Sequence, residues 1–123
     1  MKTIVSLAGA LALSVASSMP LLAADAAKGD SDVTSVKGEV IDLACYADHG
    51  ASGAKHAGCA QKCISSGLPV GLKTGDGKLY IVIGDHKPMN KELAPEAGKV
   101  VTLKGKIASR DGVNLLENAE LVQ

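Results

Sequence analysis

The sequence predicts a small, mainly β domain, a five-stranded Greek-key barrel of the OB type with a cysteine- and histidine-bearing helix inserted after the first strand. Five short segments rich in β-branched and aliphatic residues alternate with turn residues. A helical pattern falls between the first two strands, and a second, shorter one falls between the third and the fourth. The chain has no Phe or Trp, so its core must be built from smaller side chains, and closing the sheet into a barrel suits such a core.

The first 24 residues read as a secretory signal peptide. Met1 and Lys2 precede an apolar run that ends in small residues, and cleavage after Ala24 fits this pattern. Removing 24 of the 123 residues leaves 99, and the loss of Lys2 leaves 12 basic against 13 acidic side chains. We therefore expect a periplasmic or secreted protein with a flexible lead over residues 25–35 and one folded domain over residues 36–123.

The near-neutral charge limits the classes of partner. Without a basic run there is no electrostatic footprint for nucleic acid. After signal cleavage no apolar stretch is long enough to cross a bilayer, so we expect no membrane insertion. The sequence is compatible with a protein partner but does not identify one.

The first strand and the inserted helix precede the rest of the barrel. The segment VKGEVIDLA at residues 36–44 predicts a strand that bends or bulges at Gly38 and ends at Cys45. Ala, Lys, Gln and Cys over residues 54–66 then favour a helix, with Ser52 as a candidate cap and with Gly67 and Pro69 as a stop.

The remaining elements follow from turn residues. GDG at residues 75–77 lies between two apolar runs and predicts a hairpin, and two prolines leave room for only a short helix before the fourth strand. The turn RDG precedes the last strand. The expected elements are strands at 69–74 and 78–84, a helix at 90–93, and strands at 99–109 and 113–122.

All three cysteines and two of the three histidines lie within residues 45–63. If the inserted segment is helical, His56, Cys59 and Cys63 share one face. Cys45, at the end of the first strand, can meet that face. The pattern predicts a Cys₃His metal site formed by Cys45, His56, Cys59 and Cys63, with His49 as an additional candidate.

Thiolate and imidazole ligands select zinc, copper(I) or iron over magnesium or calcium, and the Cys₃His set favours one zinc ion. A fully occupied site would be structural, whereas a site with an open position could carry and transfer metal. Asp42 is a candidate either to accept a hydrogen bond from His56 or to cap a backbone N–H. His86, far along the chain, is expected on the surface.

The alternative is an extracytoplasmic thiol/disulfide protein in which two cysteines pair and one thiol is spare. The spacing of Cys59 and Cys63 is not the C-x-x-C of thioredoxin-like enzymes, and no C-x-x-C-H haem-attachment sequence is present. The chain shows no Ser, His and Asp set and no paired carboxylates. It therefore offers no catalytic residues, and a non-enzymatic role is favoured.

Three segments carry a resemblance: GEVIDLACY, HAGCAQKCISSGLPVGL and KLYIVIGD. They resemble a family of small exported bacterial proteins of unknown function with a D-x-x-C-Y, H-x-x-C-A-x-x-C and G-x-P-V-G-L signature. The resemblance covers most of the chain after residue 24. It implies an OB-like barrel with Cys45, His56, Cys59 and Cys63 as metal ligands, and it implies no activity.

Overall fold

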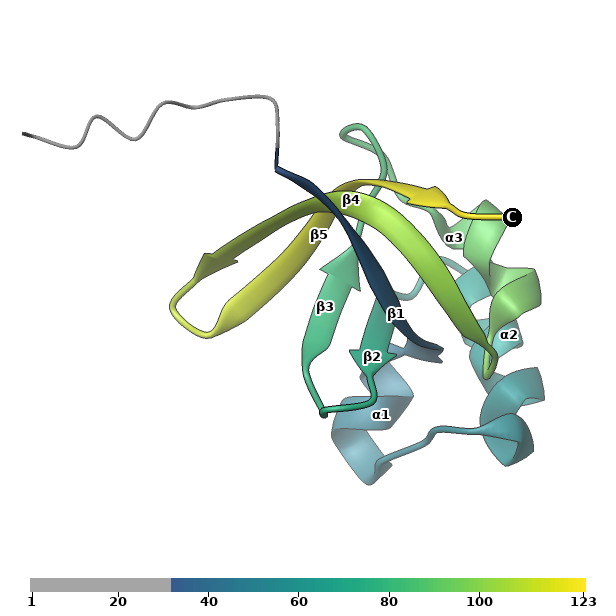
Figure 1. Ribbon diagram of the computed structural model, residues 1–123. Helices are drawn as coiled ribbons and strands as arrows, with labels where there is room; N and C mark the ends of the chain where they lie inside the picture. Colours follow the sequence, from purple (N-terminus) through teal and green to yellow (C-terminus); the bar gives the residue numbers. More distant parts are fainter. Residues whose placement is uncertain (1–31) are drawn as a thin grey trace, which may run out of the picture.

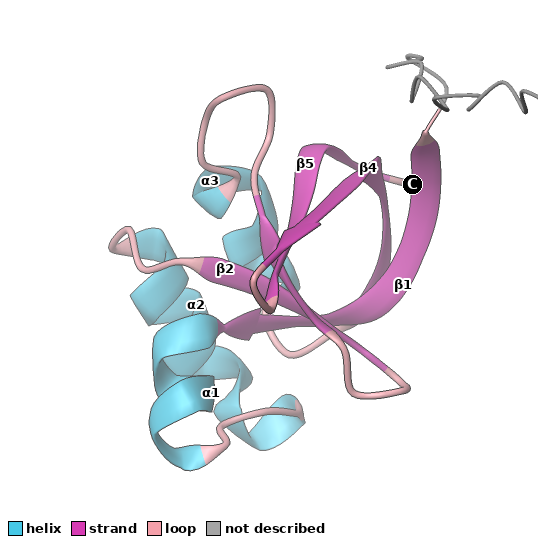
Figure 2. Cartoon of the chain, turned by 90° about the vertical axis from the view of Figure 1, so that its left-hand side faces the viewer, coloured by secondary structure: helices cyan, strands magenta, loops and turns pink. Residues whose placement is uncertain are grey.

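The computed structural model describes residues 32–123, which form a closed barrel with helices at one end (Figures 1 and 2). The signal peptide expected over residues 1–24 lies outside the described residues, as do residues 25–31 of the expected lead. The elements are β1 (Val33–Asp42), α1 (Leu43–His49), a 3₁₀ turn (Ala54–His56), α2 (Ala57–Ser65), β2 (Val70–Thr74), β3 (Leu79–Val82), α3 (Asn90–Leu93), a second 3₁₀ turn (Ala94–Glu96), β4 (Val100–Arg110) and β5 (Val113–Leu121).

The strand order confirms the predicted fold class. Around the barrel the strands run β1-β2-β3-β5-β4 and back to β1. Every neighbouring pair is antiparallel except β3 and β5, which are parallel. With α3 between β3 and β4, this is a small α+β barrel of the OB type. Among residues 32–123, no helix combines the length and apolarity needed to cross a membrane.

β1 closes the barrel because it pairs with two strands. Gly38 pairs with Val101 of β4 on one side and with Thr74 of β2 on the other. A Cβ on Gly38 would lie 2.7 Å from the carbonyl oxygen of Lys73, so the close approach of β2 requires glycine. The pairing runs through Gly38 without a bulge, and β1 curves along its length (Figure 2).

The irregularity in the barrel lies instead between β4 and β5, where β5 carries one extra residue. Lys104 pairs with Glu120 and Lys106 pairs with Glu117, so the register shifts by one residue opposite Gly105. A Cβ on Gly105 would come within 2.8 Å of the carbonyl oxygen of Glu117. Gly105 thus lies opposite a bulge in β5, where Asn118 and Ala119 face this one residue and Asn118 has a φ of 52°.

The core is aliphatic, as the composition requires. Leu72, Leu103 and Leu116 from the strands are fully buried. Ile64 of α2 and Leu93 of α3 join the same cluster, so both helices pack onto the barrel. The side-chain amide of Asn90 donates to the carbonyl oxygens of Ile64 at 2.8 Å and Leu68 at 2.7 Å, which fixes the end of α2 against α3.

Two sequence expectations at β1 were wrong. The strand begins at Val33, inside the expected flexible lead, because residues 33–37 pair with β4. It ends at Asp42 rather than Ala44, and α1 follows where a strand end and loop were expected. The reason is local: Asp42 caps the helix at its start, and Gly50, with φ 72°, ends it in the left-handed region.

The inserted helix also differs in detail from the expectation. Residues 54–56 form a 3₁₀ turn, and the α-helix begins only at Ala57. Ser52 does not cap either segment, because Gly53 and His56 occupy the cap positions and no side chain bonds there. The helix ends at Ser65, followed by Gly67 with φ 103°.

Candidate metal centre

The three cysteines form one cluster between two helices. Cys45 lies on α1, and Cys59 and Cys63 lie one turn apart on α2. Their three Sγ atoms all lie within 4.8 Å of one another, and all three thiols are free. Cys59 is exposed, while Cys45 and Cys63 are half-buried. The structure therefore brings together three of the four ligands expected from the sequence.

Backbone contacts hold α1 in place beside α2. The N–H of Leu43 donates to the carbonyl oxygen of Pro69 at 3.1 Å, where the chain leaves α2 and enters β2. The Leu43 side chain packs over Gly71, where an added Cβ would lie 2.6 Å from its Cδ2 atom. None of the residues of α1 is buried. Its position therefore depends on few apolar contacts.

The loop after α1 is tied to the barrel. Glu39 of β1 accepts a hydrogen bond from the backbone N–H of Gly53, and Lys73 of β2 places its Nζ 5.2 Å from the centre of the Tyr46 ring. On the other side, Gly98 with φ 76° approaches Ala57 so closely that a Cβ would lie 2.7 Å from the alanine methyl. These contacts hold α1, the loop after it and the start of α2 against the rest of the fold.

A buried carboxylate lies beside the thiols. Asp42 is 1% exposed and accepts hydrogen bonds from the backbone N–H groups of Ala44 and Cys45, each at 3.2 Å. The hydrogen bond from the Cys45 thiol to this carboxylate, with burial and its negative charge, raises the pKa of Cys45 from 9.0 to about 12. Burial is the main cause that raises the pKa of Cys63. Of the two roles considered for Asp42, the backbone cap is confirmed.

The two histidines of this segment lie outside the cluster. His49 ends α1 and His56 immediately precedes α2, with ring centres 6.4 Å apart. Neither imidazole is among the ligand atoms that lie within 4.8 Å of one another. His49 Nδ1 is 3.1 Å from a carboxylate oxygen of Asp48, a contact that the sequence did not indicate. His86, as expected, is on the surface, with a side chain 95% exposed.

The three cysteines lie close enough to hold a metal ion, and no disulfide forms among them. Thiolates gathered from two helices are a usual ligand set for zinc and other thiophilic ions. No pair of cysteines is bridged in residues 32–123, which contain every cysteine of the chain. The surroundings raise the pKa of Cys45 and of Cys63, which lowers the thiolate fraction of these two side chains in the metal-free protein.

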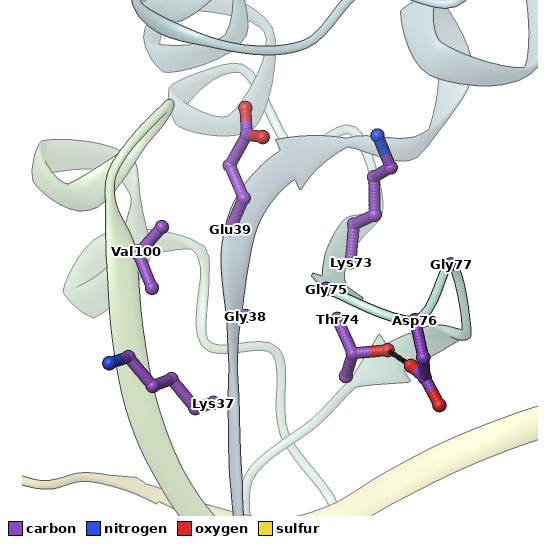
Figure 3. A pocket seen from close by; sticks show the side chains of 9 residues that line it. All are labelled: Lys37, Gly38, Glu39, Lys73, Thr74, Gly75, Asp76, Gly77 and Val100. Atoms are coloured by element: carbon purple, nitrogen blue, oxygen red, sulfur yellow. Dashed lines mark hydrogen bonds between the residues drawn. The ribbon is translucent and has the colours of Figure 1, made fainter.

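A separate surface hollow lies between β1, the β2–β3 turn and the start of β4 (Figure 3). No aromatic side chain lines it. Its two carboxylates already serve local contacts, because Glu39 binds Gly53 N–H and Asp76 accepts a hydrogen bond from the Thr74 hydroxyl. This hollow offers no set of convergent free polar groups comparable to the cysteine cluster.

Fold and cluster together define a small OB-type barrel that presents three thiols on helices at one end. No protein-family model, curated protein or solved structure matches the chain. The three clustered thiols are therefore the feature of this chain that indicates a function.

Proposed function

We propose that this protein is exported and binds one transition-metal ion, zinc, between α1 and α2 through Cys45, Cys59, Cys63 and one histidine. The observation that carries the proposal is the convergence of three Sγ atoms, from two helices, to within 4.8 Å of one another. Export is expected from the signal-like residues 1–24.

Charge favours a divalent over a monovalent ion. Three thiolates carry three negative charges. The complex with zinc(II) therefore has a net charge of −1, and the complex with copper(I) has a net charge of −2. The buried carboxylate of Asp42 adds a further negative charge beside Cys45. Excess buried charge is costly, so this site disfavours the more anionic copper(I) form. Iron(II) has the same charge as zinc, but zinc lies above it in the general order of affinities.

The metal would act as a structural link. α1 has no buried residue and contacts the barrel mainly through Leu43, Tyr46 and its backbone. A metal bound by both helices would fasten α1 to α2, which the core residue Ile64 already anchors. The free energy of binding would then add to that of folding.

A metal-carrying role is the second candidate. Cys59 is the exposed member of the cluster, and an exposed thiolate can be replaced by a ligand from another protein. A structural site would release zinc slowly to a competing chelator, and a carrier would release it rapidly. The two roles are therefore separable by the rate of zinc transfer to a chromophoric chelator.

Native mass spectrometry tests the proposal. The protein is purified without chelator or added metal and treated with a thiol-alkylating reagent before and after denaturation. We expect the mass of one zinc ion and three thiols that react only after denaturation. A metal-free mass two hydrogens light, with a single reactive thiol, would instead indicate a disulfide and reject the proposal.

A further inference from the structure

α1 presents a cysteine and a histidine on the same side. Cys45 and His49 are four residues apart within one α-helix, the same spacing as Cys59 and Cys63 in α2. Side chains at this spacing are neighbours on a helix surface. Each helix therefore supplies one such pair, and Cys45 of the α1 pair already lies in the cluster.

The end of α1 is fixed immediately after His49. Gly50 has φ 72°, and its N–H donates to the carbonyl oxygen of Tyr46 at 2.8 Å. The N–H of Ala51 reaches the carbonyl oxygen of Cys45 at 3.4 Å. These bonds close the last turn of the helix and set the direction in which the His49 side chain leaves it.

The imidazole of His49 has a carboxylate partner on one nitrogen. Nδ1 is 3.1 Å from Oδ2 of Asp48, and this contact favours the tautomer in which Nδ1 carries the proton. Nε2 is then left with a free lone pair. Metal-binding histidines commonly have this arrangement, in which a carboxylate orients the ring from its far nitrogen.

His56 lacks such support. It lies in the 3₁₀ turn before α2, and no hydrogen bond within residues 32–123 involves its imidazole. Its ring centre is 6.4 Å from that of His49, so the two rings are neighbours. Only one of them is oriented by a neighbouring group.

We propose that His49, through Nε2, is the fourth metal ligand, that Asp48 is its positioning residue, and that His56 is not a ligand. This inference rests on the proposed function and adds the identity of the histidine. It assigns the ligand pairs as Cys45 with His49 on α1 and Cys59 with Cys63 on α2.

Cobalt(II) is the probe for the experiment, because it replaces zinc in such sites and its visible spectrum reports the ligands. The full mature chain is titrated with cobalt(II), and zinc affinity is then measured by competition. We expect His49→Ala to alter the cobalt spectrum and to weaken zinc binding by 100-fold or more, on the order of the largest effects seen at supporting residues. Asp48→Asn should weaken zinc binding about tenfold while keeping the same cobalt spectrum.

The chain contains a matched control. Asp85 and His86 repeat the Asp-His sequence on the surface, with a 4.0 Å contact between their side chains. Asp85→Asn and His86→Ala should leave the cobalt spectrum and the zinc affinity unchanged. His56→Ala should do the same if the inference is correct.

Replacement of the ligand provides the decisive comparison. His49→Cys should restore tight binding as a Cys₄ site, with stronger thiolate-to-cobalt absorption than the unmodified protein. A loss of affinity in His56→Ala, with His49→Ala unaffected, would overturn the inference, and so would two unaffected variants. In both cases the unmodified protein still binds the metal, whereas failure of that protein to bind cobalt or zinc would overturn the proposed function itself.

Discussion

The carboxylate of Asp42 accepts a hydrogen bond from the backbone N–H of Cys45 at 3.2 Å and also raises the pKa of the Cys45 thiol. One buried side chain therefore starts α1 and sets the charge beside the cysteine cluster. The capping role needs an oxygen acceptor, but the electrostatic role needs a negative charge, and the two can be separated by substitution.

Asp42→Ala should lower the free energy of unfolding by about 1–2 kcal/mol, because it removes the cap and leaves two backbone donors without a partner. Asp42→Asn keeps an acceptor oxygen and should cost less. It should also lower the pKa of Cys45 and reduce the preference for zinc over copper(I). Denaturant unfolding and pH titration of the thiolate ultraviolet absorbance measure these effects. An unchanged Cys45 pKa in Asp42→Asn would contradict the electrostatic role.

Much of the barrel could be predicted from local patterns. The hairpin followed from the GDG turn, and α3 begins at Asn90 and ends at Leu93, as expected from the flanking prolines. What the patterns could not give was the full length of β1. Val33 through Ser35 are exposed and look like part of a polar lead, and only their pairing with β4 orders them as a strand.

The site was predictable in part. Helical spacing brought Cys59 and Cys63 together, and Cys45 was expected to join them. The short helix that carries Cys45 was missed, although Asp42 and Gly50 at its ends are the usual cap and stop. The β-branched run before it favoured a continued strand. Because this helix was not expected, the sequence did not show that Cys45 and His49 share one helical face.

Glycine substitutions should separate the barrel from the site. Gly38→Ala would place a Cβ 2.7 Å from a backbone oxygen of β2 and should destabilise the barrel by about 1–3 kcal/mol. At Gly71 the added Cβ instead meets the Leu43 side chain, so α1 should shift and zinc affinity should fall with a smaller loss of stability. Thermal melting and zinc competition measure the two effects.

Gly75→Ala is the matched control, because a Cβ there meets no atom within 4 Å. It should change neither stability nor zinc affinity. If Gly71→Ala binds zinc as tightly as the unmodified protein, then the packing of Leu43 does not position the site.

Zinc binding should strengthen steeply with pH. The pKa values of Cys45, about 12, and of Cys63 lie above their ordinary value of 9.0, so both thiols are protonated at neutral pH in the metal-free protein. Zinc must displace both protons, so its affinity should rise by at least about 100-fold per pH unit between about pH 6 and 8. Competition titrations across this range measure the slope, and a pH-independent affinity would exclude these thiols as ligands.

In the metal-free protein, the raised pKa of Cys45 makes the free energy of unfolding fall as the pH rises. Because the pKa of Cys45 is higher in the folded than in the unfolded state, the folded state holds its proton more tightly. The stability that this proton contributes to the folded state is complete below pH 9.0 and is lost as the pH rises toward about 12. Cys45→Ser should remove this part of the alkaline loss of stability.

Zinc should protect α1 more than the barrel from amide hydrogen exchange. α1 has no buried residue, whereas the strands hold the fully buried Leu72, Leu103 and Leu116. We therefore expect the metal-free protein to open locally at α1 while the barrel stays closed.

Zinc at 100 times its dissociation constant would oppose that opening by about 2.7 kcal/mol, which corresponds to about 100-fold slower exchange in α1. Cys63→Ser, which removes the thiol between Cys45 and Cys59, should abolish the protection and leave barrel exchange unchanged. Equal slowing in every strand would mean instead that the metal stabilises the whole fold, and that α1 does not open independently.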